Sequence, residues 1–410
     1  MSIHAIATGR AESMFLPDIE RQAETIRTAV KGRRVLAIGA AGSIGSNTAV
    51  VLGRFEPATL HVIDQNENAL AEFVRQFRSD ANAPDIPDFR TLPLDYGSAA
   101  MRYLMQQERP YDIVLNFAAI KHVRSEKDSF SILQMLDTNI VKQARFRRWL
   151  AESSPEARYF SVSTDKAANP SSFMGATKRI MEHVLFDADI APGFRGEVTS
   201  ARFANVAFSN GSLLQSFENR LARGEPLACP KEIRRYFVSL EESGHICTLA
   251  ALLAPAGHIA IPRLDPREHL VPLRGIAEKF LEASGYAPRL YDDESAAKAE
   301  LDETRGAKRW PLIMTPADTG GEKPYEEFVA NGETVVEIGL GSMQAVTHRP
   351  SPTGNLADVI GRLERVVAGD GAGVDATEID KDRLKGVIGE IEPDFLATHR
   401  DSDRNLDQRA

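Results

Sequence analysis

One short stretch of the chain gathers side chains that can exchange protons. Ser163, Thr164, Asp165 and Lys166 follow one another directly after the apolar run Tyr159–Val162. An acid and a base placed together are what an elimination or a redox reaction requires. The apolar run predicts a buried strand, and in open α/β sheets chemistry takes place just beyond the carboxyl ends of the strands. A plain strand-to-helix loop followed by a capped helix is the alternative interpretation.

A glycine-rich segment upstream could hold a nucleotide. It has the spacing G-x-x-G-x-x-G and lies between an apolar strand at 33–38 and a helix expected at 47–55. Such glycines permit a tight turn, a close approach of the backbone to a pyrophosphate, and close helix–strand packing. The N-terminus of the helix adds free N–H groups and partial positive charge. We therefore assign to a dinucleotide Gly39, Gly42, Ser43, Ile44 and Gly45.

An acidic residue after the second predicted strand bears on which dinucleotide is bound. Asp64 follows the strand at 59–63, and it can accept hydrogen bonds from the adenosine ribose. Its charge would also repel a 2′-phosphate, and Gln65 and Asn66 supply no cation for that phosphate. NAD is therefore favoured over NADP. Asp64 could also cap the helix that follows, and the two roles are compatible.

The third and fourth predicted strands end in further candidates for cofactor contacts. Asp95 could reach the adenine amino group, or it could cap a turn. Asn116 follows the fourth strand and is followed by Ala118 and Ala119, whose small side chains would let the backbone lie flat along the cofactor. A long helix is expected from 131 to 151, and a polar residue near its middle, Asn139, should have a tertiary partner.

Several polar side chains further along could line a substrate site. Arg234 or Arg235 could clamp a substrate phosphate, although a solvated basic pair is an equal alternative. His122 is interpreted as structural or substrate-lining rather than as a general base. The residues assigned to the substrate are Lys121, His122, Asn205, Ser212 and Arg235.

Composition excludes several classes of protein. The chain has 410 residues, 43% of them hydrophobic and 26% charged, which is ordinary for a globular protein. The net charge of −9 argues against nucleic acid or an anionic membrane as a partner. Two cysteines, Cys229 and Cys247, suit neither a disulfide framework nor a metal site. Without a signal pattern or an apolar run of membrane-spanning length, we expect a cytoplasmic protein with no metal.

The alternation of strands and helices predicts an α/β fold. We expect a Rossmann-like, doubly wound parallel sheet together with a smaller mixed region that binds substrate. Residues 321–328 are expected to form a loop that leads into a short helix. The expected divisions are a helical arm at 1–30, the NAD-binding and catalytic domain at 31–205, the substrate-binding region at 206–340, and a charged, partly helical tail at 341–410.

The order of these motifs resembles that of a known family. It is similar to the UDP-N-acetylglucosamine 4,6-dehydratase family, in the polysaccharide-biosynthesis branch of the extended short-chain dehydrogenase/reductases. The resemblance covers about 16–329. It is carried by Gly39-x-x-Gly42-Ser43-Ile44-Gly45-Ser46, Asp64, Lys121-His122-Val123, Ser163-Thr164-Asp165-Lys166-Ala167-x-Asn169-Pro170, Met174-Gly175-Ala176-Thr177-Lys178-Arg179, Arg202-Phe203-x-Asn205-Val206, Arg235-Tyr236-Phe237 and Gly321-Glu322-Lys323.

The resemblance implies a reaction and a set of roles. NAD⁺ takes hydride from sugar C4, water is eliminated across C5 and C6, and the hydride returns to C6 to give a 4-keto-6-deoxy sugar. By the family's motif, Asp165 is the acid that protonates the departing C6 hydroxyl, and Lys166 is the base that takes the C5 proton. Thr164 would bond the C4 oxygen, and Lys178 would hold the nicotinamide ribose.

One catalytic position departs from the wider superfamily. Met174 stands four residues before Lys178, where short-chain dehydrogenases usually have tyrosine, and a thioether cannot exchange the C4 hydroxyl proton. Methionine here resembles the subgroup that retains the C5 configuration. The expected substrate is a UDP-N-acetyl-hexosamine such as UDP-N-acetylglucosamine, and the expected assembly is a homo-oligomer. The alternatives are a 4-epimerase or ketoreductase, a dehydratase acting on a GDP-linked sugar, and a non-catalytic NAD-binding protein.

Overall fold

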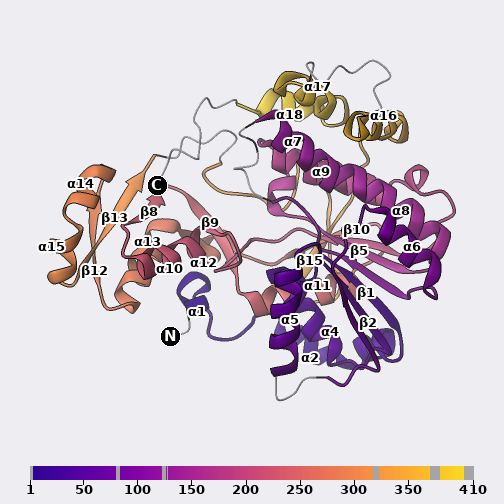
Figure 1. The fold of residues 1–410 in the computed structure, drawn as a ribbon, viewed down its shortest axis with the longest axis horizontal. Helices are drawn as coiled ribbons and strands as arrows, with labels where there is room; N and C mark the ends of the chain where they lie inside the picture. Colours follow the sequence, from indigo (N-terminus) through magenta and orange to yellow (C-terminus); the bar gives the residue numbers. More distant parts are fainter. Residues whose placement is uncertain are drawn as a thin grey trace.

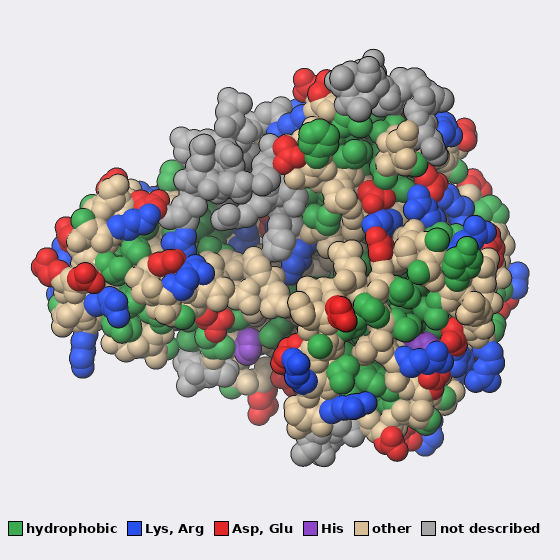
Figure 2. All heavy atoms as spheres, viewed as in Figure 1, with side chains coloured by type: hydrophobic (Ala, Val, Ile, Leu, Met, Phe, Trp, Pro, Cys, Tyr) green, Lys and Arg blue, Asp and Glu red, His purple; other side chains and the backbone are tan. Residues whose placement is uncertain are grey.

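The computed structural model has one large sheet with helices on both faces and a smaller region at one end (Figure 1). It describes residues 3–79, 84–121, 126, 128–316, 323–369 and 379–400. Within these ranges the predicted α/β fold is confirmed. In the face shown in Figure 2, acidic and basic side chains are interspersed over the described surface. Over the whole chain acidic residues are in excess, which gives the net charge of −9.

The large sheet has the strand order of a doubly wound fold. Its strands run in parallel from β3 to β10, and β15 is antiparallel to β10. The order reverses between β1 and β4, and ligands bind at such a switch point. Across the sheet, the strands are β14 (Val335–Val336), β15 (Met343–Thr347), β10 (His258–Pro262), β6 (Val198–Ala201), β5 (Arg158–Val162), β4 (Ile113–Asn116), β1 (Arg34–Ile38), β2 (Thr59–Ile63) and β3 (Asp88–Leu92).

Both faces of this sheet are covered by helices, which is why the central strand β1 is apolar and buried from Val35 to Ile38. In β1, Val35 and Ala37 pack into one core, whereas Leu36 and Ile38 pack into the core of the other face. The first face is covered by α2 (Leu16–Arg21), α3 (Ala23–Val30), α4 (Ser43–Gly53), α5 (Glu67–Ser79) and α11 (Leu240–Leu253). The second is covered by α6 (Ala99–Gln107), α8 (Lys142–Ser153) and α9 (Phe173–Phe186).

The smaller region is built on two three-stranded sheets with a core of their own. One sheet contains β11 (Leu270–Pro272), β9 (Arg234–Val238) and β7 (Asn205–Val206), and the other contains β12 (Ala287–Tyr291), β13 (Arg309–Thr315) and β8 (Leu227–Pro230). The helices of this region are α1 (Ile3–Thr8), α10 (Leu213–Arg223), α12 (Pro266–His269), α13 (Leu273–Ala283), α14 (Glu294–Ala299) and α15 (Leu301–Gly306).

The helix expected from 131 to 151 contains an irregular turn. It is divided into α7 (Ser129–Leu136), a π-helical turn over Asp137–Val141, and α8. Asn139 lies in this turn, and its amide bonds both backbone groups of Ile120 and the Thr177 hydroxyl. The expected tertiary partner of Asn139 is therefore present. π-Turns of this kind occur often at functional sites, and this one ties the loop after β4 to α9.

Two expectations about the chain after residue 320 require correction. The described part of the expected loop and helix, 323–334, contains no helix. The expected tail begins at 341, yet β15 pairs with β10 and so belongs to the large sheet. Only the later residues form helices, which are α16 (Leu356–Ala368), α17 (Lys381–Ile391) and α18 (Pro393–Thr398). The wider division into domains stays a prediction. Among the described helices, none has the length and apolar character needed to span a bilayer.

Candidate functional site

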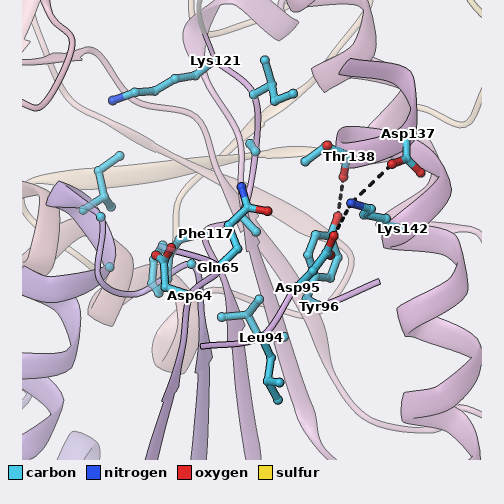
Figure 3. Close-up of a pocket in the computed structure, with 18 of the residues that line it drawn as sticks. Asp64, Gln65, Leu94, Asp95, Tyr96, Phe117, Lys121, Asp137, Thr138 and Lys142 are labelled. Atoms are coloured by element: carbon cyan, nitrogen blue, oxygen red, sulfur yellow. Dashed lines mark hydrogen bonds and ion pairs between the residues drawn. The ribbon is translucent and has the colours of Figure 1, made fainter. Parts of the chain in front are cut away.

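A cavity of about 560 Å³ lies at the switch point of the large sheet (Figure 3). It is placed where β1 and β4 end, as the doubly wound order predicts for a nucleotide site. Most residues assigned to the dinucleotide line it. They are Gly39, Gly42, Ser43, Ile44, Gly45, Asp64, Asp95, Ala118 and Ala119.

The glycine loop has the shape that a pyrophosphate site needs. Helix α4 begins at Ser43, four residues earlier than expected, with Gly42 as its N-cap. Gly39 has φ +68°, and a Cβ atom there would lie 2.6 Å from the Ala118 nitrogen. A Cβ atom at Gly45 would lie 2.5 Å from Cα of Ala40. The loop can therefore approach β4 this closely only with glycine, and it leaves the N-terminus of α4 facing the cavity.

Asp64 and Asp95, two of the carboxylates that line this cavity, have different hydrogen-bond partners. The Asp64 carboxylate accepts a hydrogen bond from the Asn66 nitrogen at 3.0 Å, and burial raises its pKa. Asp95 instead accepts a bond of 2.5 Å from Nζ of Lys142, which also lies 3.3 Å from Asp137 (Figure 3). The assignment of Asp95 therefore has to include an ion pair that the sequence did not indicate. Lys142 was missed because its partner lies 47 residues away.

Asn116 differs from the other assigned residues, because its side chain does not line the cavity. Its amide donates to Oε1 of Gln143 at 2.8 Å and accepts from the Ala118 nitrogen at 3.0 Å. The side chain is buried, and a buried amide needs such partners. Asn116 thus supports the loop that carries Ala118 and Ala119 rather than facing a ligand itself.

A second cavity of about 370 Å³ adjoins the first and contains the acid–base cluster. The two cavities share Ile44, Phe117, Ala119 and Lys121 in their linings. In the cluster, Oδ1 of Asp165 accepts hydrogen bonds from Oγ1 of Thr164 at 2.8 Å and from Nζ of Lys166 at 3.1 Å. Oδ2 of Asp165 is buried and has no hydrogen-bond partner among the described residues. The predicted acid and base are therefore in contact, with one carboxylate oxygen uncommitted.

The backbone around this cluster is held from two sides. Thr164 caps the short 3₁₀ turn Asp165–Ala167, which follows directly after β5. Gly175, in the first turn of α9, lets that turn approach the helix, since a Cβ atom there would lie 2.5 Å from the Lys166 carbonyl oxygen. Ser172 caps α9 by accepting a bond from the Gly175 nitrogen. The sequence therefore folds locally into a rigid support for Lys166.

Two residues of α9 face the same cavity. Met174 lines it, and its backbone nitrogen donates to Oε1 of Glu126 at 2.9 Å. Nζ of Lys178 is buried and donates to the Val162 carbonyl oxygen at 2.6 Å. Burial lowers the pKa of Lys178 to about 7, against an opposing effect of the Glu182 charge. Lys178 can therefore hold or release a proton near neutral pH.

The residues assigned to the substrate meet at this cavity, apart from one that cannot be placed. Lys121, Asn205, Ser212 and Arg235 all line it, and His122 lies outside the described residues. Ser212 also caps α10. Nη1 of Arg235 donates to the carbonyl oxygens of Arg234, Lys323 and Pro324. Arg235 therefore anchors the segment 323–334 as well as facing the cavity.

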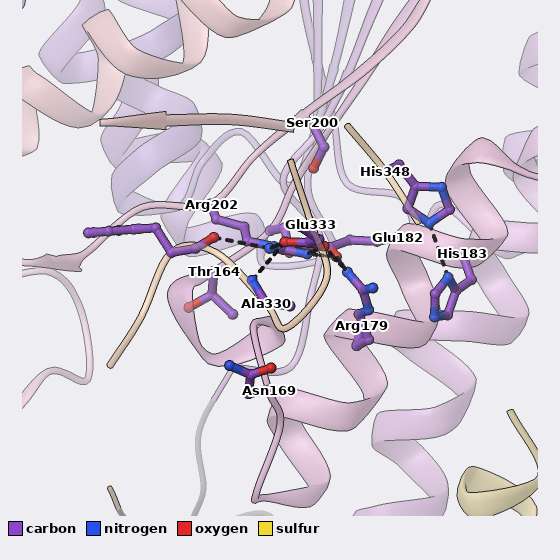
Figure 4. Close-up of polar contacts among 12 residues, drawn as sticks. Thr164, Asn169, Arg179, Glu182, His183, Ser200, Arg202, Ala330, Glu333 and His348 are labelled. Carbon is purple, nitrogen blue, oxygen red and sulfur yellow. Dashed lines mark hydrogen bonds and ion pairs between the residues drawn. The ribbon is translucent and has the colours of Figure 1, made fainter. Parts of the chain in front are cut away.

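Behind the acid–base cluster lies a buried network that sequence analysis missed (Figure 4). We call it the arginine–glutamate network, and it consists of Arg179, Glu182, Arg202 and Glu333. Arg202 bonds both carboxylates at 2.6–2.8 Å and is fully buried. Oε1 of Glu182 also accepts a 2.6 Å bond from the Ser163 hydroxyl. The network therefore joins the residue before Thr164 to the segment 323–334.

The C-terminal helices support α9 from the outside. Oε1 of Glu392 accepts bonds from Arg179 at 3.3 Å and from Nε2 of His183 at 2.7 Å. The Thr398 hydroxyl donates to the Pro170 carbonyl oxygen at 2.8 Å. Phe395 packs against Phe173, the first residue of α9, with ring centroids 5.3 Å apart. These helices thus contact α9 directly, which no motif indicated.

Comparison with known proteins identifies the family to which the chain belongs. Residues 35–347 match the family described as "Polysaccharide biosynthesis protein". An uncharacterized membrane protein of Methanocaldococcus jannaschii is 28% identical over 74% of this chain and 82% of its own length. The capsular polysaccharide biosynthesis protein CapD of Staphylococcus aureus is 28% identical over 67% of this chain, which spans about half (47%) of CapD.

A relative with a named reaction matches over a shorter range. The UDP-N-acetylglucosamine 4,6-dehydratase (inverting) of Campylobacter jejuni is 27% identical over 57% of this chain and 67% of its own length. Among solved structures, Pen from Bacillus thuringiensis superposes with a TM-score of 0.62 at 22% identity, covering 79% of this chain and 89% of Pen. This structural likeness supports the fold.

Proposed function

The chain belongs to the polysaccharide biosynthesis protein family of short-chain dehydrogenase/reductases, and we propose that it is a nucleotide-sugar 4,6-dehydratase. The proposed substrate is a UDP-N-acetyl-hexosamine such as UDP-N-acetylglucosamine. The observation that carries the proposal is the contact between Asp165 and Lys166 in a cavity that adjoins the nucleotide cavity. An elimination needs an acid and a base at neighbouring carbons, and this pair supplies both.

The first cavity fits a nicotinamide dinucleotide. Gly42 has open space around a Cβ position apart from the Gly39 oxygen at 3.3 Å, so a pyrophosphate can approach the N-terminus of α4. Asp64 would accept hydrogen bonds from the ribose hydroxyls. It favours NAD over NADP because its charge repels a 2′-phosphate. Lys178 would hold the nicotinamide ribose. When bound, the oxidised nicotinamide supplies the reversible acceptance of hydride from the sugar.

The cluster residues divide the proton transfers between them. Thr164 would bond the sugar C4 oxygen and, as the hydride leaves C4, relay the C4 hydroxyl proton to Asp165, whose Oδ1 accepts a hydrogen bond from the Thr164 hydroxyl at 2.8 Å. Lys166 would take the C5 proton, which becomes acidic once C4 is a ketone. Asp165 would protonate the leaving C6 hydroxyl, and its uncommitted Oδ2 is the oxygen free to do so. The products are water and an unsaturated ketone bound in the cavity, which is then reduced at C6.

Met174 bears on the stereochemical outcome. The side chain is buried and lines the cavity, yet it cannot donate or accept a proton. With methionine at this position, Lys166 would be the group that exchanges the C5 proton, which would then leave and return on a single face of the sugar. We therefore propose that the C5 configuration is retained, unlike the inverting reaction named for the Campylobacter jejuni relative.

The test is product analysis in deuterated water with NAD and UDP-N-acetylglucosamine, with the GDP-linked sugar in parallel. A dehydratase gives a product that has lost water and carries deuterium at C5 and protium from C4 at C6. Proton NMR coupling constants at C5 then distinguish retention from inversion. A product that keeps its C6 hydroxyl and differs only at C4 would mean an epimerase or ketoreductase instead, and the proposal would be abandoned.

A further inference from the structure

A second carboxylate, Glu326, lies beside Lys166 without a role in the reaction described so far. Its Oε1 is 3.8 Å from Nζ of Lys166 and 4.0 Å from Nη2 of Arg235. The residue is only 5% exposed, although it belongs to the irregular segment 323–334. Lys166 is therefore flanked by two carboxylates, Asp165 on one side and Glu326 on the other.

The position of Glu326 is fixed by contacts on both of its sides. Nζ of Lys323 donates to the carbonyl oxygens of Ala168 and Asn169 at 3.2 and 2.5 Å. The Asn169 amide donates to Oε2 of Glu327 at 3.1 Å, and its oxygen accepts from the Asn331 nitrogen at 2.9 Å. The segment is thus tied to the loop that follows Lys166. These hydrogen bonds, rather than an isolated surface contact, hold Glu326 close to Lys166.

Glu326 and Lys166 face different cavities. Lys166 lines the substrate cavity of about 370 Å³, whereas Glu326 lines another cavity of about 540 Å³. Among the described residues, none lines both. Tyr325 and Glu327, at the rim of the Glu326 cavity, are exposed, so water reaches this side. The Lys166–Glu326 pair therefore spans the wall between the substrate and a second source of water.

The charges around Glu326 allow it to carry a proton. Burial raises its pKa, and the nearby Asp165 charge raises it further, while the Lys166 charge and then the Arg235 and Lys323 charges lower it. Its protonated and ionised forms are thus closer in free energy than for an exposed glutamate. The gap of 3.8 Å is longer than a hydrogen bond, and a small side-chain rotation or one bridging water closes it.

We propose that Glu326 is the proton-exchange partner of Lys166, connecting it to water in the second cavity. This inference rests on the proposed function. Neutral Lys166 takes the C5 proton and becomes an ammonium, which passes one proton to the Glu326 carboxylate, and the resulting acid exchanges it with water. The reverse transfers reload Lys166 and then C5, so no proton is gained or lost. Glu326 acts through Lys166 and does not touch the substrate.

The first test follows hydrogen at C5 of the product in deuterated water. In the wild type, exchange through Glu326 replaces the abstracted protium, so C5 carries deuterium in nearly every product molecule. In Glu326→Gln, the abstracted protium stays on the ammonium, and up to about one third of product keeps it because the lysine has three equivalent hydrogens. The control is Glu327→Gln, a neighbouring carboxylate that faces the same cavity but bonds Asn169. A deuterium content in Glu326→Gln equal to that of the control would overturn the proposal.

The second test needs no turnover and separates this inference from the proposed function. The rate of acylation of Lys166 by acetic anhydride is measured by peptide mass spectrometry across pH 6–10. Because the Glu326 carboxylate stabilises the ammonium form, Glu326→Gln should react about three- to tenfold faster near pH 8 than wild type. Glu327→Gln should react like the wild type. If no nucleotide sugar is dehydrated, the proposed function fails, and this profile alone decides whether Glu326 acts on Lys166; an unchanged rate means that it does not.

Discussion

Two buried groups of charges lie on either side of the strand end at Ser163, and they are built differently. In the arginine–glutamate network, each carboxylate oxygen of Glu182 and Glu333 accepts at least two hydrogen bonds. In the acid–base cluster, Oδ2 of Asp165 has no hydrogen-bond partner within the described part of the chain, and Lys166 is 3.8 Å from Glu326. A satisfied network stabilises one arrangement of the chain, whereas unsatisfied groups remain available for a ligand.

The pKa directions agree with this difference. Burial alone would raise the pKa of Glu182, but the charges of Arg202 and Arg179 lower it to about 2. Glu326 is buried as well, yet its cations are too distant to offset burial, and its pKa is raised. Glutamates in similar surroundings thus differ because of geometry, with contacts of 2.6 Å in one case and 3.8 Å in the other.

Removing the proposed base, Lys166, should have the largest effect on activity. We expect Lys166→Met to lower turnover by about 10³- to 10⁴-fold, because the proposed general base is lost. The midpoint of thermal unfolding should change little, because the Lys166 side chain is 20% exposed. In addition, its ionic partners are not fully hydrogen-bonded in the wild type. Steady-state kinetics and a thermal melt check both. A variant that keeps a tenth of the activity would assign the base elsewhere.

Removing Arg202 from the arginine–glutamate network should instead destabilise the fold. Arg202→Met leaves Glu182 and Glu333 buried without their main partner, and we expect a loss of about 3–5 kcal/mol in the free energy of unfolding. The Glu182 contribution is present above pH 4.5 and is lost as pH falls toward 2, so the difference between variant and wild type should shrink with acid. Urea titrations at several pH values measure it, with Arg202→Lys as the charge-conserving control. Equal stability of wild type and Arg202→Met at pH 7 would contradict the structural role.

A substitution at Gly175, which lies close to the backbone of Lys166, should reduce activity more than stability. In Gly175→Ala, the new methyl group lies 2.5 Å from the Lys166 carbonyl oxygen, which must shift. We expect turnover to fall by about 10- to 100-fold, because displacements near 1 Å are costly in catalysis. Gly361→Ala in α16 meets no atom within 4 Å and serves as the matched control with unchanged kinetics. Similar kcat values for the two variants would show that Lys166 tolerates the shift.

A buried charge with few partners, Lys178, should show a pH-dependent cost. Because its pKa is lowered to about 7 from 10.5, the folded state binds fewer protons than the unfolded state between these values, and stability rises with pH there. Lys178→Met should therefore stabilise the cofactor-free protein by about 1–3 kcal/mol at pH 6 and by less at pH 9. Denaturation at both pH values tests this. A gain that is constant with pH would mean that Lys178 does not titrate.

An exposed ion pair provides the smallest expected effect. Arg195 and Glu156 lie 2.6 Å apart with side chains more than 60% exposed. We expect Arg195→Met to change the free energy of unfolding by less than about 1 kcal/mol, since water solvates both charges. The measurement uses the same urea titration as for Arg202→Met. A loss as large as that of the buried arginine would show that burial is not what separates the two pairs.

The nucleotide side of the site could be predicted well because its residues are close in sequence. Gly39 to Gly45 form one continuous turn into α4, and their proposed roles follow from their spacing. The misplaced detail was Asn116, whose side chain turns inward to Gln143. Periodicity indicates a strand end but not which way a terminal polar side chain points, since this depends on the partners that packing supplies. The ion pair between Asp95 and Lys142 was not predicted for the same reason.

The sequence by itself determined the doubly wound sheet, the glycine loop and the adjacent acid and base at Asp165 and Lys166. These features depend on residues that are close together in the sequence. They are therefore the same in any fold in which the strand and the helix form. Only the tertiary structure brought Glu326 to Lys166, across 160 residues, and Glu333 to Arg202, across 131 residues. Such pairs form because buried charges must find partners wherever packing places them, and no pattern in the sequence records that choice.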